Sequence, residues 1–184
     1  MPPIESIEDI ILDHDKRGVA ALRPYLPVDF CTRAADYILE NPGHVVITTG
    51  FYILMSESAE TDGPPGALAI GKALQDLGMR VTYVSDSYTT PALRQIVGSA
   101  AEVVDFAIAD PEESIRASMW MLDQLDPDML ISIERCSRSK DNTYLNMRSV
   151  DISDQTARLD YLFESDLPSA VSYTHLTLPT ILLV

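Results

Sequence analysis

The chain has 184 residues, of which 46% are hydrophobic and 22% charged, with 28 acidic against 13 basic residues and a formal net charge of −15. This composition excludes a disordered or fibrous chain and suffices for one domain with a hydrophobic core. Because nucleic acids and anionic membranes repel a strongly negative protein, we expect neither as a partner.

The N-terminal segment is acidic and lacks the apolar stretch of a signal peptide, and no segment has the composition of a transmembrane span. Cys31 and Cys136 form no CxxC pattern, and the three histidines show no metal-ligand spacing. We expect a reducing, soluble compartment, the cytoplasm or alternatively the mitochondrial matrix. A homo-oligomer is compatible with the sequence.

Two helices are predicted before the first strand. The segment 4–16 places Ile7, Ile10 and Ile11 on one helical face. The segment 27–40 is followed by Asn-Pro-Gly, which ends it. We interpret both as packing helices rather than as parts of a site.

Four short apolar runs bounded by turn residues are typical of parallel strands covered on both faces. They span 45–47, 81–84, 103–108 and 129–133. Helical patterns separate them at 64–77, 90–97 and 110–125, and a polar loop and a helix at 154–163 follow. Alternating strands and helices predict a three-layer α/β fold with a doubly wound, mostly parallel, Rossmann-like sheet.

The joint between the first strand and the next helix carries the first candidate site. Thr49-Gly50 ends the strand, and ETDGPPG at 60–66 leads into the helix. In an open parallel sheet, ligands bind where strand carboxyl ends meet helix N-termini. The glycines allow close backbone approach, and N–H groups at the helix start favour a carboxylate or phosphate. An ordinary, well-capped connection explains the same residues about as well.

A basic cluster in the loop after the fourth strand is the second candidate site. It contains Arg135, Arg138, Lys140 and Arg148. In a parallel sheet, Glu134 and Arg135 would end at the same edge as the first joint, so two polar loops would converge on one crevice. Arginines in an acidic chain favour an anionic small ligand, because guanidinium groups bind carboxylates bidentately. A solvated loop with internal ion pairs is the alternative.

Nucleotide-binding motifs are incomplete. The segment 66–73 fits G-x-x-x-x-G-K, but Ala73 replaces the hydroxyl residue that would bind Mg²⁺, and the segment has a helical pattern. No G-x-G-x-x-G follows the first strand, and we expect no nucleotide cofactor. Asp86, after the second strand, could still hold a ribose hydroxyl, so a nucleotide- or small-anion-binding module without catalysis is the alternative function.

Together, the two loops resemble a known family. The stretches that carry the resemblance are Ile47-Thr-Thr-Gly-Phe51, ETDGPPGA at 60–67, Ile133-Glu-Arg135, Lys140-Asp141, Tyr144, Asn146-Met-Arg148 and Asp151-Ile-Ser153. They resemble the D-glutamate cyclase family over roughly residues 20–165. The chain departs from the family pattern at Cys136-Ser137, where the family tends to have Pro or Ala followed by Gly, and at Asn142 and Ser149, where it has glycine.

The resemblance implies a hydro-lyase that converts D-glutamate to 5-oxo-D-proline and water by attack of the amine on the γ-carboxyl. It implies that the catalytic base is one of four carboxylates, Glu60, Asp62, Glu134 and Asp141. It implies substrate binding by Thr49, Gly50, Thr61, Gly63, Gly66, Arg135, Lys140, Tyr144, Asn146 and Arg148. The cofactor is left open, with Mg²⁺ or Mn²⁺ on Asp62 and Glu134 as one arrangement.

The C-terminal stretch differs in composition from the rest of the chain. No Asp, Glu, Lys or Arg occurs from Leu167 to Val184. We expect one α/β domain at 1–170 and a non-native or disordered tail at 171–184, with poor packing from about Ser169. The family continues into a glycine-rich GDGGNE-type motif beyond this point. The domain is therefore expected to be incomplete, and an inactive fragment is a further alternative.

Overall fold

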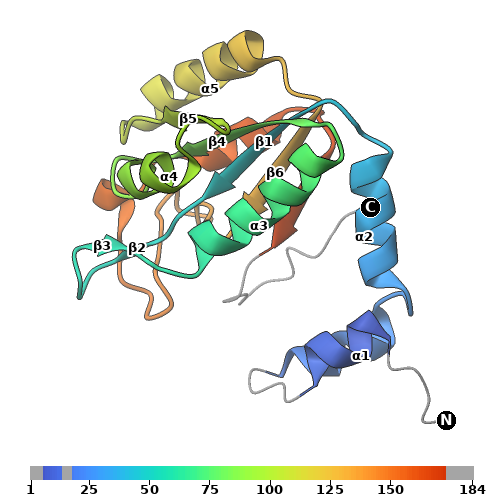
Figure 1. The fold of residues 1–184 in the computed structure, drawn as a ribbon. Helices are drawn as coiled ribbons and strands as arrows, with labels where there is room; N and C mark the ends of the chain where they lie inside the picture. Colours follow the sequence, from blue (N-terminus) through green and yellow to red (C-terminus); the bar gives the residue numbers. More distant parts are fainter. Residues whose placement is uncertain (1–5, 14–17, 173–184) are drawn as a thin grey trace, which may run out of the picture. The chain divides into compact units, whose positions relative to one another are not determined.

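A computed structural model describes residues 6–13 and 18–172 of the chain (Figure 1). The chain divides into two compact units, the first ending at Asn41 and the second beginning at Pro42. The first unit contains α1 (Ile7–Leu12), the 3-10 helix η1 (Val19–Tyr25) and α2 (Phe30–Leu39). Both predicted N-terminal helices are present, each shorter than its pattern.

Helix α1 begins with a capping box. Ser6 Oγ accepts a hydrogen bond from the Asp9 backbone N–H at 3.1 Å, and the Asp9 carboxylate accepts one from the Ser6 N–H at 3.4 Å. The expectation that its apolar face packs is not met, because Ile7, Ile10 and Ile11 are each more than half exposed. Six residues make less than two turns, too short a stripe to cover a neighbouring element.

The second unit is built on a five-stranded, all-parallel sheet in the order β5-β4-β1-β6-β7. Its strands are β1 (His44–Thr49), β4 (Arg80–Ser85), β5 (Glu102–Asp105), β6 (Met129–Ile133) and β7 (Ser169–Ser172). The central strands β1 and β6 are buried along their whole length, as expected of apolar runs covered on both faces. The predicted parallel α/β fold is confirmed.

Helices cover both faces of this sheet, with α3 and α5 on opposite sides (Figure 1). The helices are α3 (Gly63–Asp76), α4 (Thr90–Val97) and α5 (Pro111–Leu125). Alternation along β4 shows the two faces: Val84 belongs to the core cluster that includes Met121 of α5, whereas Tyr83 lies against Gly71 of α3. A side chain at Gly71 would clash with the Tyr83 hydroxyl, so this glycine allows the helix to pack closely.

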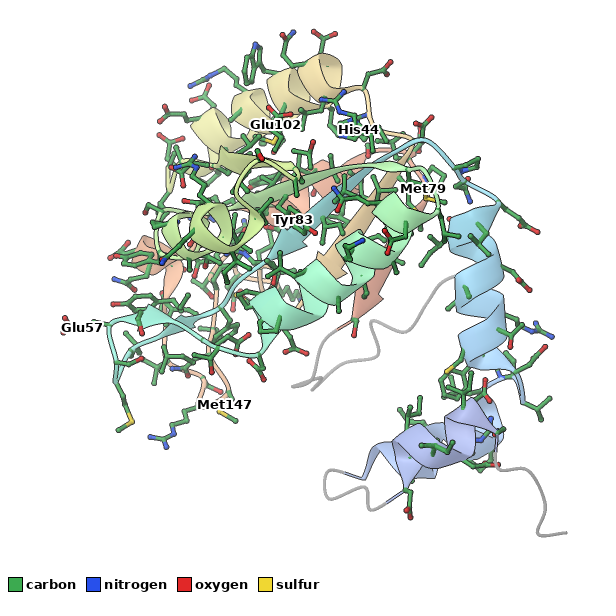
Figure 2. The ribbon with its side chains drawn as sticks, viewed as in Figure 1. His44, Glu57, Met79, Tyr83, Glu102 and Met147 are labelled. Atoms are coloured by element: carbon green, nitrogen blue, oxygen red, sulfur yellow. The ribbon has the colours of Figure 1, made fainter. Side chains whose placement is uncertain are left out.

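The loops at the carboxyl end of the sheet form a small structure of their own. The strand β1 leads into a hairpin of β2 (Tyr52–Ile53) and β3 (Ser58–Ala59). A second core cluster of Phe51, Cys136, Tyr144 and Ile152, with Ile53 packed against it, joins this region to the loop after β6. Figure 2 shows Glu57 and Met147, from these two loops, at the end of the sheet opposite His44.

The helix predicted at 154–163 is wrong. Two 3-10 helices, η2 (Ser153–Gln155) and η3 (Leu159–Glu164), stand there instead. Between them, Thr156 is extended (φ −126°, ψ 115°), and the Ala157 carbonyl accepts hydrogen bonds from the Arg135 guanidinium and the Leu159 N–H rather than from the N–H of Tyr161, four residues on. A long-range contact therefore interrupts the local helical pattern.

The expectation of poor packing from about Ser169 is wrong for Ser169–Ser172. These residues form β7, the outermost parallel strand next to β6, and the Glu134 N–H donates to the Ser172 carbonyl at 2.9 Å. Backbone pairing needs no charged side chain, so the composition of this stretch was a poor guide to its structure. Residues 173–184, where the tail was expected, lie outside the described residues.

Candidate active site at the carboxyl end of the sheet

The register of β1 and β6 brings the two candidate loops together. Thr49 is the partner of Ile133, so Gly50 and Glu134 follow at the same end of adjacent strands. Helix α3 begins beside them at Gly63. A Cβ built on Gly63 would lie 2.8 Å from Glu134 Cβ, 3.1 Å from Thr49 Oγ1 and 3.3 Å from Glu60 Oε1. The predicted convergence of the two loops on one edge is confirmed.

Four oxygen-bearing side chains thus gather at the start of α3, and we call Thr49, Glu60, Asp62 and Glu134 the oxygen cluster. Thr49 and Glu134 are buried, Glu60 is half-buried and Asp62 is exposed. Among the described residues, Thr49 Oγ1 and Glu60 Oε1 are buried without a hydrogen-bond partner. Buried polar atoms are rarely left unpaired in folded proteins, which makes this cluster the candidate active site.

Glu134 holds an uncommon backbone conformation at this point. Its φ is +47°, in the left-handed region that a glutamate seldom adopts, and only 7% of the residue is exposed. Such a conformation costs on the order of 1–3 kcal/mol and persists only where its surroundings enforce it. Strain of this kind gathers at functional sites, and here it directs the residue after β6 toward Gly63.

Glu60 is the most perturbed carboxyl of the cluster. Burial, then the negative charges of Asp62 and Glu134, and a hydrogen bond with Asp62 raise its pKa from 4.5 to about 8. Glu60 therefore keeps its proton at neutral pH. A carboxyl that is protonated at neutral pH can act as a general acid, and after losing the proton as a general base.

The start of α3 lacks the free N–H groups that were expected to bind an anion. The Gly63 N–H donates to Asp62 Oδ1 at 3.2 Å, and the Gly66 N–H donates to the Asp62 carbonyl at 3.3 Å. Pro64 and Pro65 have no N–H. The first turn therefore offers the positive end of the helix dipole but no hydrogen-bond donor, and the expected backbone donation from Gly63 and Gly66 is not available.

Arg135 was expected to bind a substrate carboxylate, and the structure gives its guanidinium internal partners. Nη1 donates to Asp86 Oδ2 at 2.6 Å and to the Gly50 carbonyl at 2.9 Å, and Nη2 donates to the Ala157 carbonyl at 2.7 Å. The side chains of Arg135 and Asp86 are each only 4% exposed. Arg135 thus ties together the ends of β1, β4 and β6 and the segment before η3.

The same contact changes the interpretation of Asp86. The sequence offered this residue as a ligand for a ribose hydroxyl, but its carboxylate is buried against Arg135. Gly50 (φ +102°) lies nearby with its Cα against Ser85 and Thr89, so it shapes the strand end rather than opening a ligand surface. Sequence spacing gave no signal for this ion pair, because its partners are 49 residues apart.

Two further expected binding residues, Tyr144 and Asn146, hold the loop after β6 in place. Tyr144 is fully buried, donates its hydroxyl to Asp160 and lies under the Arg158 guanidinium, 5.2 Å from ring centroid to Cζ. Burial and the Asp160 hydrogen bond raise the pKa of the phenol. Asn146 Oδ1 accepts from the backbone N–H groups of Arg148 and Val150 and so forms a turn.

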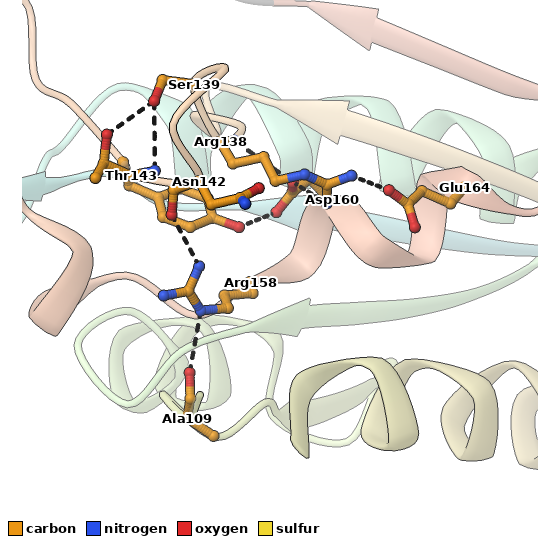
Figure 3. Close-up of polar contacts among 9 residues, drawn as sticks. Ala109, Arg138, Ser139, Asn142, Thr143, Arg158, Asp160 and Glu164 are labelled. Atoms are coloured by element: carbon orange, nitrogen blue, oxygen red, sulfur yellow. Dashed lines mark hydrogen bonds and ion pairs between the residues drawn. The ribbon is translucent and has the colours of Figure 1, made fainter. Parts of the chain in front are cut away.

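The network drawn in Figure 3 fastens this loop to η3 and to the start of α5. Arg138 pairs with Asp160 and Glu164, and Arg158 donates to the carbonyls of Asn142 and Ala109. Internal ion pairs were the alternative interpretation of this loop, and for Arg138 they are what the structure shows.

Four expected site residues are exposed, namely Thr61, Lys140, Asp141 and Arg148. Within the described ranges, the Lys140 ammonium and the Arg148 guanidinium form no ion pair. They are therefore the cations of this loop that remain available to a ligand. Cys136 is buried, and burial raises its pKa to about 11, which keeps the thiol protonated and makes it a poor nucleophile.

For residues 6–13 and 18–172, no group of three or more His, Cys, Asp or Glu side chains is arranged to hold a metal ion. The same part of the chain contains no helix long and apolar enough to cross a membrane.

A parallel α/β unit with a protonated carboxyl at the carboxyl end of its central strands belongs to the class that binds small molecules at this end of the sheet. The chain matches the family described as D-glutamate cyclase-like, C-terminal, over residues 7–174, and it belongs to that family. It is similar to the human protein "D-glutamate cyclase, mitochondrial", with 30% identity over 174 residues. The match covers 87% of this chain and 28% of that relative, so the chain spans less than a third of the relative's length.

Proposed function

We propose that the chain carries the catalytic residues for intramolecular dehydration of D-glutamate to 5-oxo-D-proline. The observation that supports this most strongly is Glu60, a carboxyl with a pKa of about 8 beside two further carboxylates at the carboxyl end of β1 and β6. Family membership and the similarity to a D-glutamate cyclase give the reaction class.

The reaction needs protons moved in a defined order. The substrate ammonium must lose a proton before nitrogen can attack the γ-carboxyl carbon. A C–N bond then forms, a C–O bond breaks, and the departing oxygen leaves as water with two protons that came from the ammonium. One proton stays on the ring nitrogen, so the reaction needs no external acid or base, only groups that carry protons over a short distance.

The oxygen cluster supplies such groups. In the proposal, Glu134 accepts one proton from the substrate ammonium, and the second passes to the γ-carboxyl oxygen as the C–N bond forms. Glu60 delivers its own proton to that oxygen, which departs as water, and Glu134 then returns its proton to Glu60. Asp62 holds Glu60 protonated through its charge and hydrogen bond. Lys140 and Arg148, the available cations of the loop after β6, would pair with the substrate carboxylates. Arg135 would position Glu134, its neighbour in the chain, through the buried contacts described above.

The alternative of a nucleotide-binding module has less support. Its ribose ligand, Asp86, is paired with Arg135 and buried, and the first turn of α3 has no free N–H for a phosphate. If that alternative held, ATP or NAD should raise the melting temperature of the chain while D-glutamate should not.

The test is formation of 5-oxoproline from D-glutamate and from L-glutamate, with and without Mg²⁺ or Mn²⁺. Glu60→Gln should lower kcat by about 10²–10⁴-fold with a small change in KM, because a general acid acts in the transition state. Glu112→Gln, on the exposed face of α5, is the matched control and should keep full activity. If neither D-glutamate nor L-glutamate gave 5-oxoproline, the proposed function would be refuted. If Glu60→Gln kept full activity, the proposed role of Glu60 would be refuted.

A further inference from the structure

The oxygen cluster packs closely around Gly63, because a side chain at this position would meet Glu134 Cβ at 2.8 Å. Thr49 Oγ1 and Glu60 Oε1 point to the same side of Gly63, at 3.1 and 3.3 Å from the position that a Cβ would take. Glycine at position 63 lets the backbone approach two acceptors that have no hydrogen-bond partner among the described residues, and buried acceptors of this kind indicate a ligand that donates hydrogen bonds.

Thr49 provides an independent sign of a ligand. The residue is fully buried, yet its hydroxyl has no hydrogen-bond partner in the described part of the chain. An unpaired buried hydroxyl destabilises the folded chain and is uncommon in proteins. Thr49 faces α3, because it alternates with Thr48 along β1 and Val46 and Val84 belong to the cluster on the α5 side. Its hydroxyl is thus directed at the start of α3, beside Gly63.

The chemistry of the surroundings selects the ligand. Carboxyl and hydroxyl oxygens gather around Gly63, the guanidinium of Arg135 is committed to Asp86, and the first turn of α3 has no free N–H. The acceptor oxygens of Thr49 and Glu60, with the negative charges of Asp62 and Glu134 beside them, favour a cation that donates hydrogen bonds. A primary ammonium has three such donors, whereas a quaternary ammonium has none.

We propose that Thr49, Glu60 and Glu134, around Gly63, form a binding site for a primary ammonium group. This inference rests on the proposed function where it assigns that group to the α-ammonium of the amino-acid substrate. The site would then hold the nitrogen that attacks, beside the carboxylate that takes its proton, while the exposed cations of the loop after β6 hold the carboxylates. Substrate orientation would follow from the separation of these two charges.

The test uses methylammonium as the probe, with tetramethylammonium at equal ionic strength as the donor-free control. The carboxyl carbon resonance of Glu60 is followed by NMR in the whole chain. Methylammonium should shift this resonance saturably, and tetramethylammonium should not. Thr49→Val should weaken the methylammonium effect about tenfold, the loss expected for one hydrogen bond to a charged group.

Thr48→Val is the matched control. Thr48 is also fully buried with an unpaired hydroxyl, but it lies on the opposite face of β1. It should bind methylammonium like the wild type, and both variants should have similar melting temperatures. Equal shifts with both ammonium ions, no shift with methylammonium, or equal weakening in both variants would overturn the proposal.

The outcome is separable from the cyclase assay. Methylammonium binding without 5-oxoproline formation would keep the ammonium site and remove the proposed function. Turnover of D-glutamate by a chain that fails to bind methylammonium would keep the proposed function and remove the ammonium site.

Discussion

Replacing Glu60 by glutamine should remove a pH-dependent cost to the stability of the folded chain. The pKa of this carboxyl rises from 4.5 to about 8 on folding, because of burial and then of the charges of Asp62 and Glu134. Between these two values the unfolded chain has lost the proton and the folded chain keeps it. The contribution of Glu60 to the free energy of unfolding is therefore fully present below pH 4.5, and it is lost as the pH rises through about 8.

The size of this effect follows from the two pKa values. At about 1.4 kcal/mol for each pH unit of separation, the difference between 4.5 and about 8 corresponds to at most about 5 kcal/mol. Glu60 is only half-buried, and water screens its charge, so we expect about 2–3 kcal/mol. Glutamine resembles the protonated acid and cannot ionise. Glu60→Gln should therefore match the wild type at low pH and exceed its unfolding free energy by this amount above pH 8.

Urea unfolding followed by circular dichroism, at about pH 5 and about pH 8.5, measures the difference. Glu112→Gln, an exposed glutamate on α5, should unfold like the wild type at both pH values apart from a small loss of its ion pair with Arg116. If the difference in unfolding free energy between Glu60→Gln and the wild type were the same at both pH values, the raised pKa of Glu60 would be refuted. A gain in unfolding free energy at high pH together with a loss of turnover would show that Glu60 destabilises the folded chain but is required for catalysis.

The remaining predictions concern packing and buried contacts. Gly63→Ala should lower the unfolding free energy by about 1–3 kcal/mol and reduce turnover, because its Cβ would lie 2.8 Å from Glu134 Cβ. Gly66→Ala, whose Cβ would meet Ile133 at an ordinary 3.4 Å, should have neither effect, and equal effects of the two variants in urea unfolding would contradict this prediction. Asp86→Ala should destabilise the chain by about 3–5 kcal/mol by leaving Arg135 buried and unpaired, and a loss below 1 kcal/mol would show that water reaches the guanidinium. Tyr144→Phe should cost about 1.5–3 kcal/mol through the lost hydrogen bond to a carboxylate, as measured by urea unfolding, and an unchanged midpoint would show that the bond contributes nothing.

The fold was predictable from sequence because its signals are local. The apolar run of β1 is bounded by Gly43 and Gly50, and the start of α3 is marked by Asp62 and two prolines. Parallel pairing follows from the alternation of such runs with helices. The segment before β7 was mispredicted because its conformation depends on a hydrogen bond from Arg135 to the Ala157 carbonyl, across 22 residues of sequence.

The candidate site was predictable in position but not in chemistry. In a parallel sheet the residues after two neighbouring strands, here Gly50 and Glu134, lie at the same end independently of their side chains. The convergence of the two loops could therefore be predicted from the topology alone. The ion pair that occupies Arg135 was not predictable, because no sequence pattern pairs it with Asp86, 49 residues away. The raised pKa of Glu60 likewise depends on burial, and burial is a property of the folded chain.

The first turn of α3 has a consequence for how this kind of fold can change its ligands. Parallel α/β sheets commonly hold phosphates at helix starts through backbone N–H groups. Here Pro64, Pro65 and the Asp62 cap remove those donors, and oxygen acceptors surround the start of α3 instead. The sign of the charge that such a helix start attracts is thus set by three residues and not by the topology. A variant with alanine in place of both prolines and of Asp62 would expose backbone donors on an unchanged scaffold, and a lineage could cross from cationic to anionic ligands by the same route.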